Sequence, residues 1–180
     1  MPSLRAVPPV VPDSGPTAIF LRVEARPFDE LAFFAAIDGA KLRALLIGRR
    51  SLVLLGIPVL TQDYDYWVHP DDAAAFNLAV APFDLAPNRS VDEARRVGRY
   101  VLEGDERVDV LIARGVSTQD GLHVRFDDVW ARRREIWLDD HVRARIPCLD
   151  DLIATKRFGS RPKDAEDIRQ LELLRKEGGE

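Results

Sequence analysis

The chain has 180 residues, of which 46% are hydrophobic and 31% are charged, which suits one buried core and excludes a disordered chain. Its formal net charge of −4 argues against a general nucleic-acid binder, because such proteins need a basic surface to bind phosphates. The single cysteine, Cys148, excludes an intrachain disulfide. We therefore expect one domain in the reducing cytoplasm.

The composition of the chain changes near residue 26. Residues 1–25 hold many prolines and no periodic pattern, so we expect a flexible, proline-rich segment followed by one domain over 26–180. The prolines also interrupt any signal peptide or membrane span. Apolar residues at helical spacing predict a helix over 28–40, and the apolar run 42–47 predicts a buried strand. A second helix should begin directly after that strand, at Gly48.

The rest of the chain predicts strands mixed with helices. Aromatic and β-branched residues predict a strand over 60–68, and a proline and two aspartates favour the start of a helix over 69–80. Residues 95–113 predict two strands joined by a hairpin around Gly104. The C-terminal part predicts a short helix, an extended segment and two further helices, over 126–137, 139–147, 148–158 and 163–177.

Three aspartates stand in the expected strands. Asp63 and Asp65 are two residues apart, so on a strand their side chains share one face, about 7 Å apart. Asp109 stands among apolar residues of another strand, where an unpaired charge would be costly. If the strands are neighbours, the three carboxylates converge and suit Mg²⁺ or Mn²⁺. The alternatives are a solvent-facing acidic strand, and an ion pair of Asp109 with Arg107.

A glycine turn precedes these carboxylates. Gly48 stands between an expected strand and an expected helix, where free N–H groups and the positive helix dipole can bind phosphate. A triphosphate bridged by Mg²⁺ could then contact both the turn and the carboxylates. A glycine at such a position also serves as a simple turn. Ser51 in the same helix start is better explained by capping or packing than by catalysis.

Several segments follow one another in a characteristic order. "LIG" precedes a helix, "DYDY" comes roughly a dozen residues later, and "VDVLI" stands on a later strand. This order resembles the nucleotidyltransferase superfamily of the DNA polymerase beta type. The C-terminal "LDDLIATKRFGSRPKDAEDIRQL" is similar to the helical region of small bacterial members related to abortive-infection toxins. The resemblance covers residues 43–175 and implies an α/β (α+β) fold with a mixed sheet, flanking helices and a C-terminal helical segment.

The resemblance also implies an activity and residue roles. It implies a Mg²⁺- or Mn²⁺-dependent enzyme that transfers a nucleoside monophosphate from a nucleoside triphosphate such as ATP to a hydroxyl or phosphate acceptor. Asp63 and Asp65 would be metal ligands, and Asp109 would be the third ligand and the base. Nucleotide contacts are implied near the glycine turn and in the C-terminal helices, at Gly48, Arg49, Ser51, Lys156 and Arg161.

Two positions depart from the pattern of the superfamily. Arg49 replaces a small residue after the glycine, and would either crowd the phosphates or add a cation to them. Val59 stands two residues before Thr61, where relatives often have an arginine. A catalytically inactive module that binds nucleotide or a partner is therefore the alternative. The acceptor could be RNA, a protein or a small molecule, and a toxin–antitoxin role with a partner protein is a further hypothesis.

Overall fold

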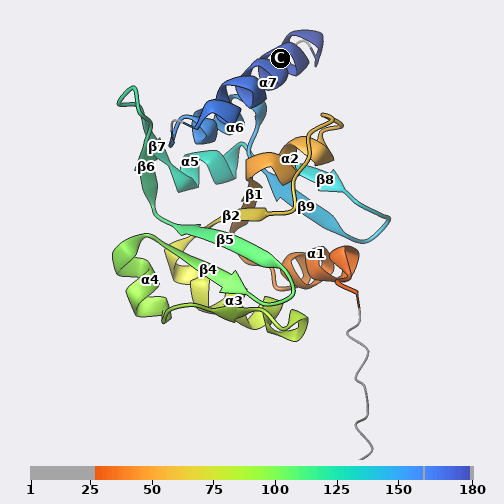
Figure 1. The fold of residues 1–180 in the computed structure, drawn as a ribbon, viewed down its shortest axis with the longest axis vertical. Coiled ribbons are helices and arrows are strands. Elements are labelled where there is room, and N and C mark those ends of the chain that lie inside the picture. Colours follow the sequence, from red (N-terminus) through yellow and green to blue (C-terminus); the bar gives the residue numbers. More distant parts are fainter. Residues whose placement is uncertain (1–26, 160, 179–180) are drawn as a thin grey trace, which may run out of the picture.

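A five-stranded mixed sheet forms the centre of the molecule (Figure 1). The computed structural model describes residues 27–159 and 161–178, so the flexible segment predicted over 1–25 lies outside the described residues. The strand order is β1 (Ala44–Ile47), β2 (Tyr64–Val68), β5 (Arg107–Ile112), β4 (Arg99–Glu103) and β3 (Ala86–Pro87). β2 and β5 run parallel, and the other neighbouring strands of this sheet are antiparallel.

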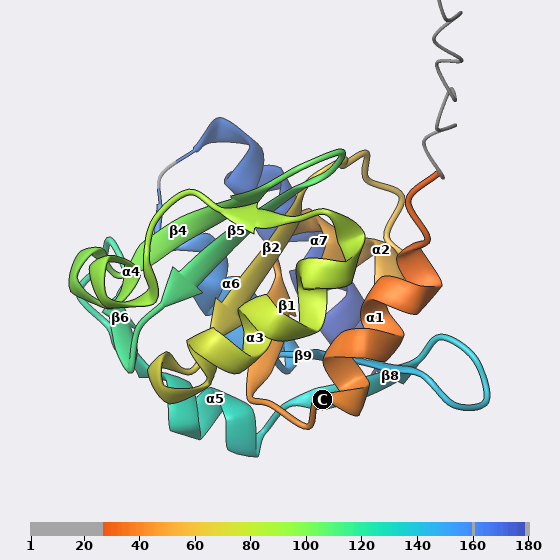
Figure 2. The same cartoon turned by 90° about the horizontal axis from the view of Figure 1, so that it is seen from below.

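Helices cover both faces of this sheet. One face carries α1 (Glu30–Gly39) and α3 (Ala73–Val80), with α4 (Val91–Val97) beside β4, as Figure 2 shows from below. Short 3-10 helices flank α3 at Pro70–Asp72 and Ala81–Phe83. The other face carries α2 (Gly48–Leu54), α5 (Phe126–Ala131), α6 (Leu149–Lys156) and α7 (Pro162–Gly178).

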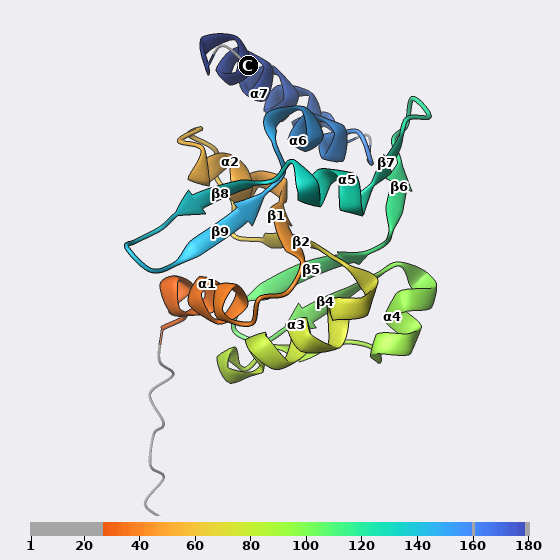
Figure 3. The same cartoon turned by 180° about the vertical axis from the view of Figure 1, so that it is seen from behind.

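Two small hairpins complete the fold (Figure 3). They are β6 (Gly115–Ser117) with β7 (His123–Arg125), and β8 (Arg134–Trp137) with β9 (Arg143–Ile146). The hairpin of β8 and β9 lies at the β1 side of the central sheet, whereas the hairpin of β6 and β7 continues from the end of β5. The predicted fold class, an α/β fold with a mixed sheet, flanking helices and a C-terminal helical segment, is confirmed.

Strand β2 divides the core into two parts because its side chains alternate between the two faces of the sheet. Tyr66 faces α3, where its ring lies 5.2 Å from that of Phe76. Trp67 points the opposite way and packs edge-on against Phe126 and Phe158, at 5.3 Å and 5.5 Å between ring centroids. Trp67 is fully buried, so it is a core residue. Asp65, two residues earlier, therefore lies on the face of α2, α5, α6 and α7.

Most of the expected elements are present, and two of their boundaries were wrong. The strand predicted over 60–68 begins only at Tyr64, because its pairing with β5 begins at Tyr64, opposite Val108, and its pairing with β1 begins at Asp65. The helix predicted over 126–137 ends at Ala131. The residues after it form β8, since β9 offers them an antiparallel partner.

Other elements were missing from the sequence prediction. β3, α4 and the β6–β7 hairpin were not expected. For α4 the signals were present: Ser90 and Glu93 form a capping box, and Gly98 ends the helix in the left-handed conformation. β3 is two residues long, which is too short for a periodic pattern to show it.

Candidate active site

Two of the three predicted aspartates stand side by side. Asp65 of β2 is in register with Asp109 of the parallel strand β5, so both carboxylates project from the same face of the sheet. Both line a cleft of about 420 Å³ that extends over β5 and β4. The neighbouring strands therefore bring together the pair that the sequence placed on separate segments.

The cleft is rich in positive charge. Arg89, Arg99, Arg107 and Arg161 line it, whereas Asp65 and Asp109 are the only acidic residues in the part of its lining that the structure describes. Its lining is thus cationic around a central pair of carboxylates. A polyanion such as a triphosphate, together with a divalent cation, matches this distribution of charge.

Gly48 allows the close approach of Asp65 to the start of α2. Its φ is +70°, a left-handed value that residues with a Cβ rarely adopt. A Cβ atom added at Gly48 would lie 2.0 Å from Oδ2 of Asp65. Glycine is therefore required at this turn both by the backbone conformation and by the neighbouring carboxylate.

The carboxylate of Asp65 lacks a compensating partner. Within residues 27–159 and 161–178 its side chain forms no hydrogen bond and no ion pair. Burial and the negative charge of Asp109 raise its pKa above the usual value, although Arg161 and Lys156 act in the opposite direction. A carboxylate that is half-buried and uncompensated gains most from a cation supplied with a ligand.

Asp109 has a different environment. Its Oδ1 accepts a hydrogen bond from Nη2 of Arg107 at 3.1 Å, and Nε of Arg107 donates to Oδ2 at 3.3 Å. Both side chains are well exposed, at 52% for Arg107 and 42% for Asp109, so water screens this pair. The ion pair that the sequence left open as an alternative is present, and it lies at the mouth of the cleft.

Asp63 is not among the residues that line the cleft of Asp65 and Asp109, although its negative charge helps to raise the pKa of Asp65. It precedes β2, is exposed, and lines a separate shallow pocket with Glu103, Asp105 and Arg107. Among the described residues, no three side chains of His, Cys, Asp or Glu are grouped closely enough to hold a metal ion. The role of Asp63 as a third ligand stays a prediction.

Two of the three cations predicted to contact nucleotide meet at one buried aspartate. Nζ of Lys156 lies 2.8 Å from Oδ2 of Asp167, and Nη2 of Arg49 lies 3.1 Å from Oδ1. Asp167 is fully buried. Burial opposes its ionisation, but hydrogen bonds from Arg49 and Lys156 hold its pKa below the usual value. The three residues join α2, α6 and α7, and their nucleotide contacts stay predictions.

Two other predicted nucleotide contacts have contrasting positions. Ser51 is buried, and its hydroxyl donates to the carbonyl oxygen of Gly48 at 2.7 Å, so it supports the glycine turn. Arg161 lines the cleft and pairs with Asp164, with Nε 3.0 Å from Oδ2. Of the three cations predicted to contact nucleotide, Arg49, Lys156 and Arg161, the last is the one that lines the cleft.

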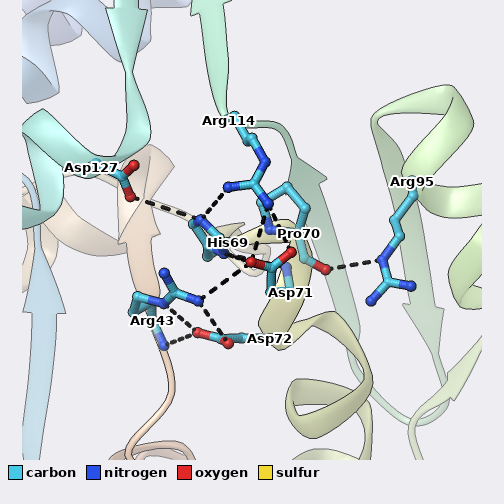
Figure 4. Close-up of polar contacts among 8 residues, drawn as sticks. All are labelled: Arg43, His69, Pro70, Asp71, Asp72, Arg95, Arg114 and Asp127. Atoms are coloured by element: carbon cyan, nitrogen blue, oxygen red, sulfur yellow. Dashed lines mark hydrogen bonds and ion pairs between the residues drawn. The ribbon is translucent and has the colours of Figure 1, made fainter.

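A second charged cluster lies at the other end of β2 (Figure 4). His69 is buried, and its Nε2 lies 3.2 Å from Nη1 of Arg114. Burial and the charge of Arg43 lower the pKa of His69. Arg43 donates to Asp72 through its backbone N–H, Nε and Nη2, at 2.9, 2.8 and 3.1 Å. Arg114 binds both oxygens of Asp71. These charges are matched within the protein.

Sequence reasoning missed two residues of the cleft, Arg89 and Arg99. Arg99 belongs to a strand that was predicted, but the alternation of a strand does not say which face a cleft occupies. Arg89 directly precedes Ser90, the capping residue of α4. The capping signal at Ser90 could have predicted that α4 begins after Arg89. The position of Arg89 beside β4, however, follows from the pairing of β3 with β4.

No family model matches the chain, and no curated protein matches its sequence. None of the described helices is long and apolar enough to cross a membrane. Solved structures do match. A candidate nucleotidyltransferase of Thermotoga maritima is 15% identical, with a TM-score of 0.50 over 80% of this chain and 86% of that one.

The antibiotic-resistance factor ANT(2'')-Ia is also similar. Its complex with adenylyl-2''-tobramycin is 16% identical, with a TM-score of 0.53 over 80% of this chain and 91% of that one. Its solution structure gives a TM-score of 0.52 at 16% identity, over 80% and 85% of the two chains. These similarities extend over most of both chains in each comparison. The chain has the nucleotidyltransferase fold.

Proposed function

We propose that the protein is a nucleotidyltransferase, which transfers a nucleoside monophosphate from a nucleoside triphosphate to a hydroxyl or phosphate acceptor. The observation that carries this proposal is the pair of Asp65 and Asp109, in register on neighbouring strands of this fold at the wall of a cationic cleft. An uncompensated carboxylate beside a second one is costly for folding alone. A site that binds a cation and phosphates gives the pair a use.

Mg²⁺ or Mn²⁺ fits this pair. Both ions prefer oxygen ligands, and Mg²⁺ commonly binds one or two carboxylates together with substrate phosphates and water. Asp65 and Asp109 would supply two such carboxylates, which is enough for an ion of this kind. Asp63 is proposed as an additional ligand. When bound, the ion would neutralise charge on the phosphates and on the leaving pyrophosphate.

The side chains of the cleft have separate tasks in this proposal. The triphosphate lies on the Gly48 side, with Arg161 near it and the carboxylates in the middle. The acceptor oxygen attacks the α-phosphorus, the new P–O bond forms as the bond to the bridging oxygen breaks, and pyrophosphate leaves with the electron pair. Asp109 accepts the proton of the acceptor hydroxyl. Arg49 and Lys156 act through Asp167, by fixing α2 and α6, or on the phosphates as the sequence predicted.

Label transfer tests the proposal directly. The protein is incubated with each α-labelled nucleoside triphosphate, Mg²⁺ or Mn²⁺, and acceptors of the small-molecule, RNA and protein classes. We expect label to appear on an acceptor, and the rate to fall at least about 1000-fold in Asp65→Asn and Asp109→Asn. Asp105→Asn is the matched control, because this exposed carboxylate lies in the β4–β5 hairpin outside the cleft. Transfer that survives both site variants would refute the proposal.

The biological setting is also a proposal. A toxin–antitoxin role predicts growth arrest on expression, and release of that arrest by Asp65→Asn or by a partner protein. Growth arrest that persists in the variant would exclude toxicity through this chemistry. ANT(2'')-Ia in its complex with adenylyl-2''-tobramycin provides a precedent for a small-molecule acceptor within the same fold.

One observation favours a second candidate, a catalytically inactive module that binds nucleotide or a partner. Arg107 already binds Asp109, and Arg49 and Lys156 already bind Asp167. In this case a triphosphate with Mg²⁺ raises the melting temperature, yet no label is transferred to any acceptor. Label transfer that is lost in Asp65→Asn would exclude this candidate.

A further inference from the structure

The cleft contains two arginines that the described part of the protein does not use. Arg89 and Arg99 line it, and within residues 27–159 and 161–178 neither forms a side-chain hydrogen bond or an ion pair. The other two arginines of the cleft each pair with an aspartate. An arginine that lies in a concave site without a carboxylate partner offers its donors to an anionic ligand.

Both arginines lie at the β4 side of the carboxylates. Val101 of β4 is in register with Asp109, and Arg99 stands two residues from Val101 on the same strand. The side chain of Arg99 therefore projects from the carboxylate face, one row along the sheet. Arg89 follows Asn88, whose N–H and side-chain oxygen bind the backbone of Val101 at 2.9 and 3.1 Å. This pairing fixes Arg89 beside the same strand.

The order of these groups across the sheet assigns the two sides of the cleft. Gly48 follows β1, Asp65 belongs to β2, Asp109 to β5, and Arg99 to β4. In an in-line displacement the attacking and leaving oxygens lie on opposite sides of the phosphorus. With the triphosphate on the Gly48 side, the acceptor occupies the β4 side. Arg89 and Arg99 then face the acceptor.

We propose that the acceptor is a small phosphorylated hydroxyl compound, whose phosphate is bound by Arg89 and Arg99. This inference rests on the proposed function. Among the described residues that line the cleft, β4 and the segment before α4 contribute Arg99 and Arg89 and no carboxylate, so an amine-rich acceptor such as tobramycin would meet like charge there. The cleft of about 420 Å³ suits a small ligand, and the net charge of −4 disfavours a long nucleic acid.

A matched pair of acceptors tests the inference by transfer. Ribose 5-phosphate is compared with ribose, and a short RNA with a free 3'-hydroxyl and tobramycin form two further arms. We expect at least tenfold higher kcat/KM for ribose 5-phosphate than for ribose, and the loss of most of this preference in Arg89→Gln and Arg99→Gln. Arg96→Gln, an exposed change on α4 outside the cleft, should keep the preference. A preference for tobramycin or RNA would overturn the inference.

A binding measurement separates this inference from the proposed function. Protein with ¹⁵N-labelled arginines is saturated with Mg²⁺ and a non-hydrolysable ATP analogue, then titrated with ribose 5-phosphate or ribose and followed by NMR. We expect the side-chain signals of Arg89 and Arg99 to shift with ribose 5-phosphate alone, and its Kd to rise about tenfold in either Gln variant. Unchanged arginine signals on addition of ribose 5-phosphate would overturn the inference. So would a transfer assay in which Arg89→Gln and Arg99→Gln raise the KM for the triphosphate as much as the KM for the acceptor. Binding without transfer to any acceptor counts against the proposed function instead.

Discussion

Strand β2 carries a charged cluster at each end, and the two clusters differ in how their charges are paired. Around His69, Arg43 binds Asp72 with three donor groups, and Nη2 of Arg114 binds both carboxylate oxygens of Asp71. Around Asp65, the carboxylate has no partner among the described side chains, and its neighbour in register is another aspartate. The paired end stabilises the fold, and the unpaired end costs stability that a ligand can recover.

The two ends of β2 therefore differ in role: the charges around His69 stabilise the fold, whereas the carboxylate of Asp65 is available to bind a ligand. Burial alone does not distinguish them, since His69 and Asp167 are more buried than Asp65. The distinction lies in the hydrogen bonds: Asp167 and Asp72 bind cations of the protein, so their pKa values fall, whereas the pKa of Asp65 rises. Removal of the carboxylate charge in Asp72→Asn at one end and in Asp65→Asn at the other should accordingly change stability in opposite directions.

The largest change in stability is expected at Gly48, the glycine that the side chain of Asp65 approaches closely. Gly48→Ala forces a Cβ onto the carboxylate at a left-handed φ, and should lower the free energy of unfolding by about 3 kcal/mol in urea denaturation. Gly56→Ala is the matched control: its φ is +82°, but a Cβ there would meet nothing within 4 Å. Equal losses in both variants would show that backbone strain, not contact with Asp65, requires the glycine.

The paired end should be the next most sensitive. Asp72→Asn removes the charge that Arg43 binds with three donors, and should cost about 2 kcal/mol at pH 7. Hydrogen bonds from Arg43 hold the pKa of Asp72 below its usual value, so this stability is present above that value and is lost as the pH falls through the lowered pKa.

A matched control for this prediction is an exposed ion pair. Asp92 pairs with Arg95 at 3.3 Å, but its side chain is 89% exposed, so Asp92→Asn should change stability by less than about 0.5 kcal/mol. Urea denaturation of both variants at neutral and acid pH measures the difference. If Asp72→Asn and Asp92→Asn lower the free energy of unfolding equally, the ion pair of Arg43 and Asp72 stabilises the fold no more than an exposed surface pair does.

The same contrast explains how far the sequence could predict the site. The order of strand, glycine turn and helix is local, so the helix start at Gly48 and the strands of Asp65 and Asp109 were predictable. Whether a charge is paired depends on partners far along the chain. Arg49 and Lys156 meet at Asp167, 118 and 11 residues away, and no spacing rule predicts that contact.

The fold shows the same limit. The turn residues around Gly104 predicted the β4–β5 hairpin, because a local turn closes it. The start of β2 at Tyr64 depends on where its ladders with β5 and β1 begin, which is a tertiary fact. For this reason Asp63 was predicted to share a strand face with Asp65, whereas it precedes the strand.

The unpaired end should gain stability when its charge is removed. Burial and Asp109 raise the pKa of Asp65, so between the ordinary value of about 3.9 and the raised value the folded state holds more protons, and stability falls as the pH rises. Asp65→Asn should therefore be more stable than the wild type by about 1 kcal/mol at pH 7, which is a few degrees in Tm.

Two comparisons test this gain. It should disappear in acid below the ordinary pKa, where both states of the wild type are protonated. Asp109→Asn should show a smaller gain, because the loss of the hydrogen bonds from Arg107 offsets the relief of its repulsion with Asp65. Thermal unfolding at pH 7 and at about pH 3 measures both. A variant that is less stable than the wild type at neutral pH would mean that Asp65 has a structural partner after all.

The smallest effect is expected at Asp63, and it decides whether the unpaired end contains two carboxylates or three. Asp63 is exposed and lies with Glu103, Asp105 and Arg107 outside the cleft, so Asp63→Asn should change the free energy of unfolding by less than about 0.5 kcal/mol. Without a triphosphate, Mg²⁺ should raise the Tm of this variant as it does the wild type, while Asp65→Asn loses the response. If Asp63→Asn also loses the rise in Tm with Mg²⁺, then Asp63 is a third ligand, as the sequence predicted, and the exposed segment before β2 moves toward the ion.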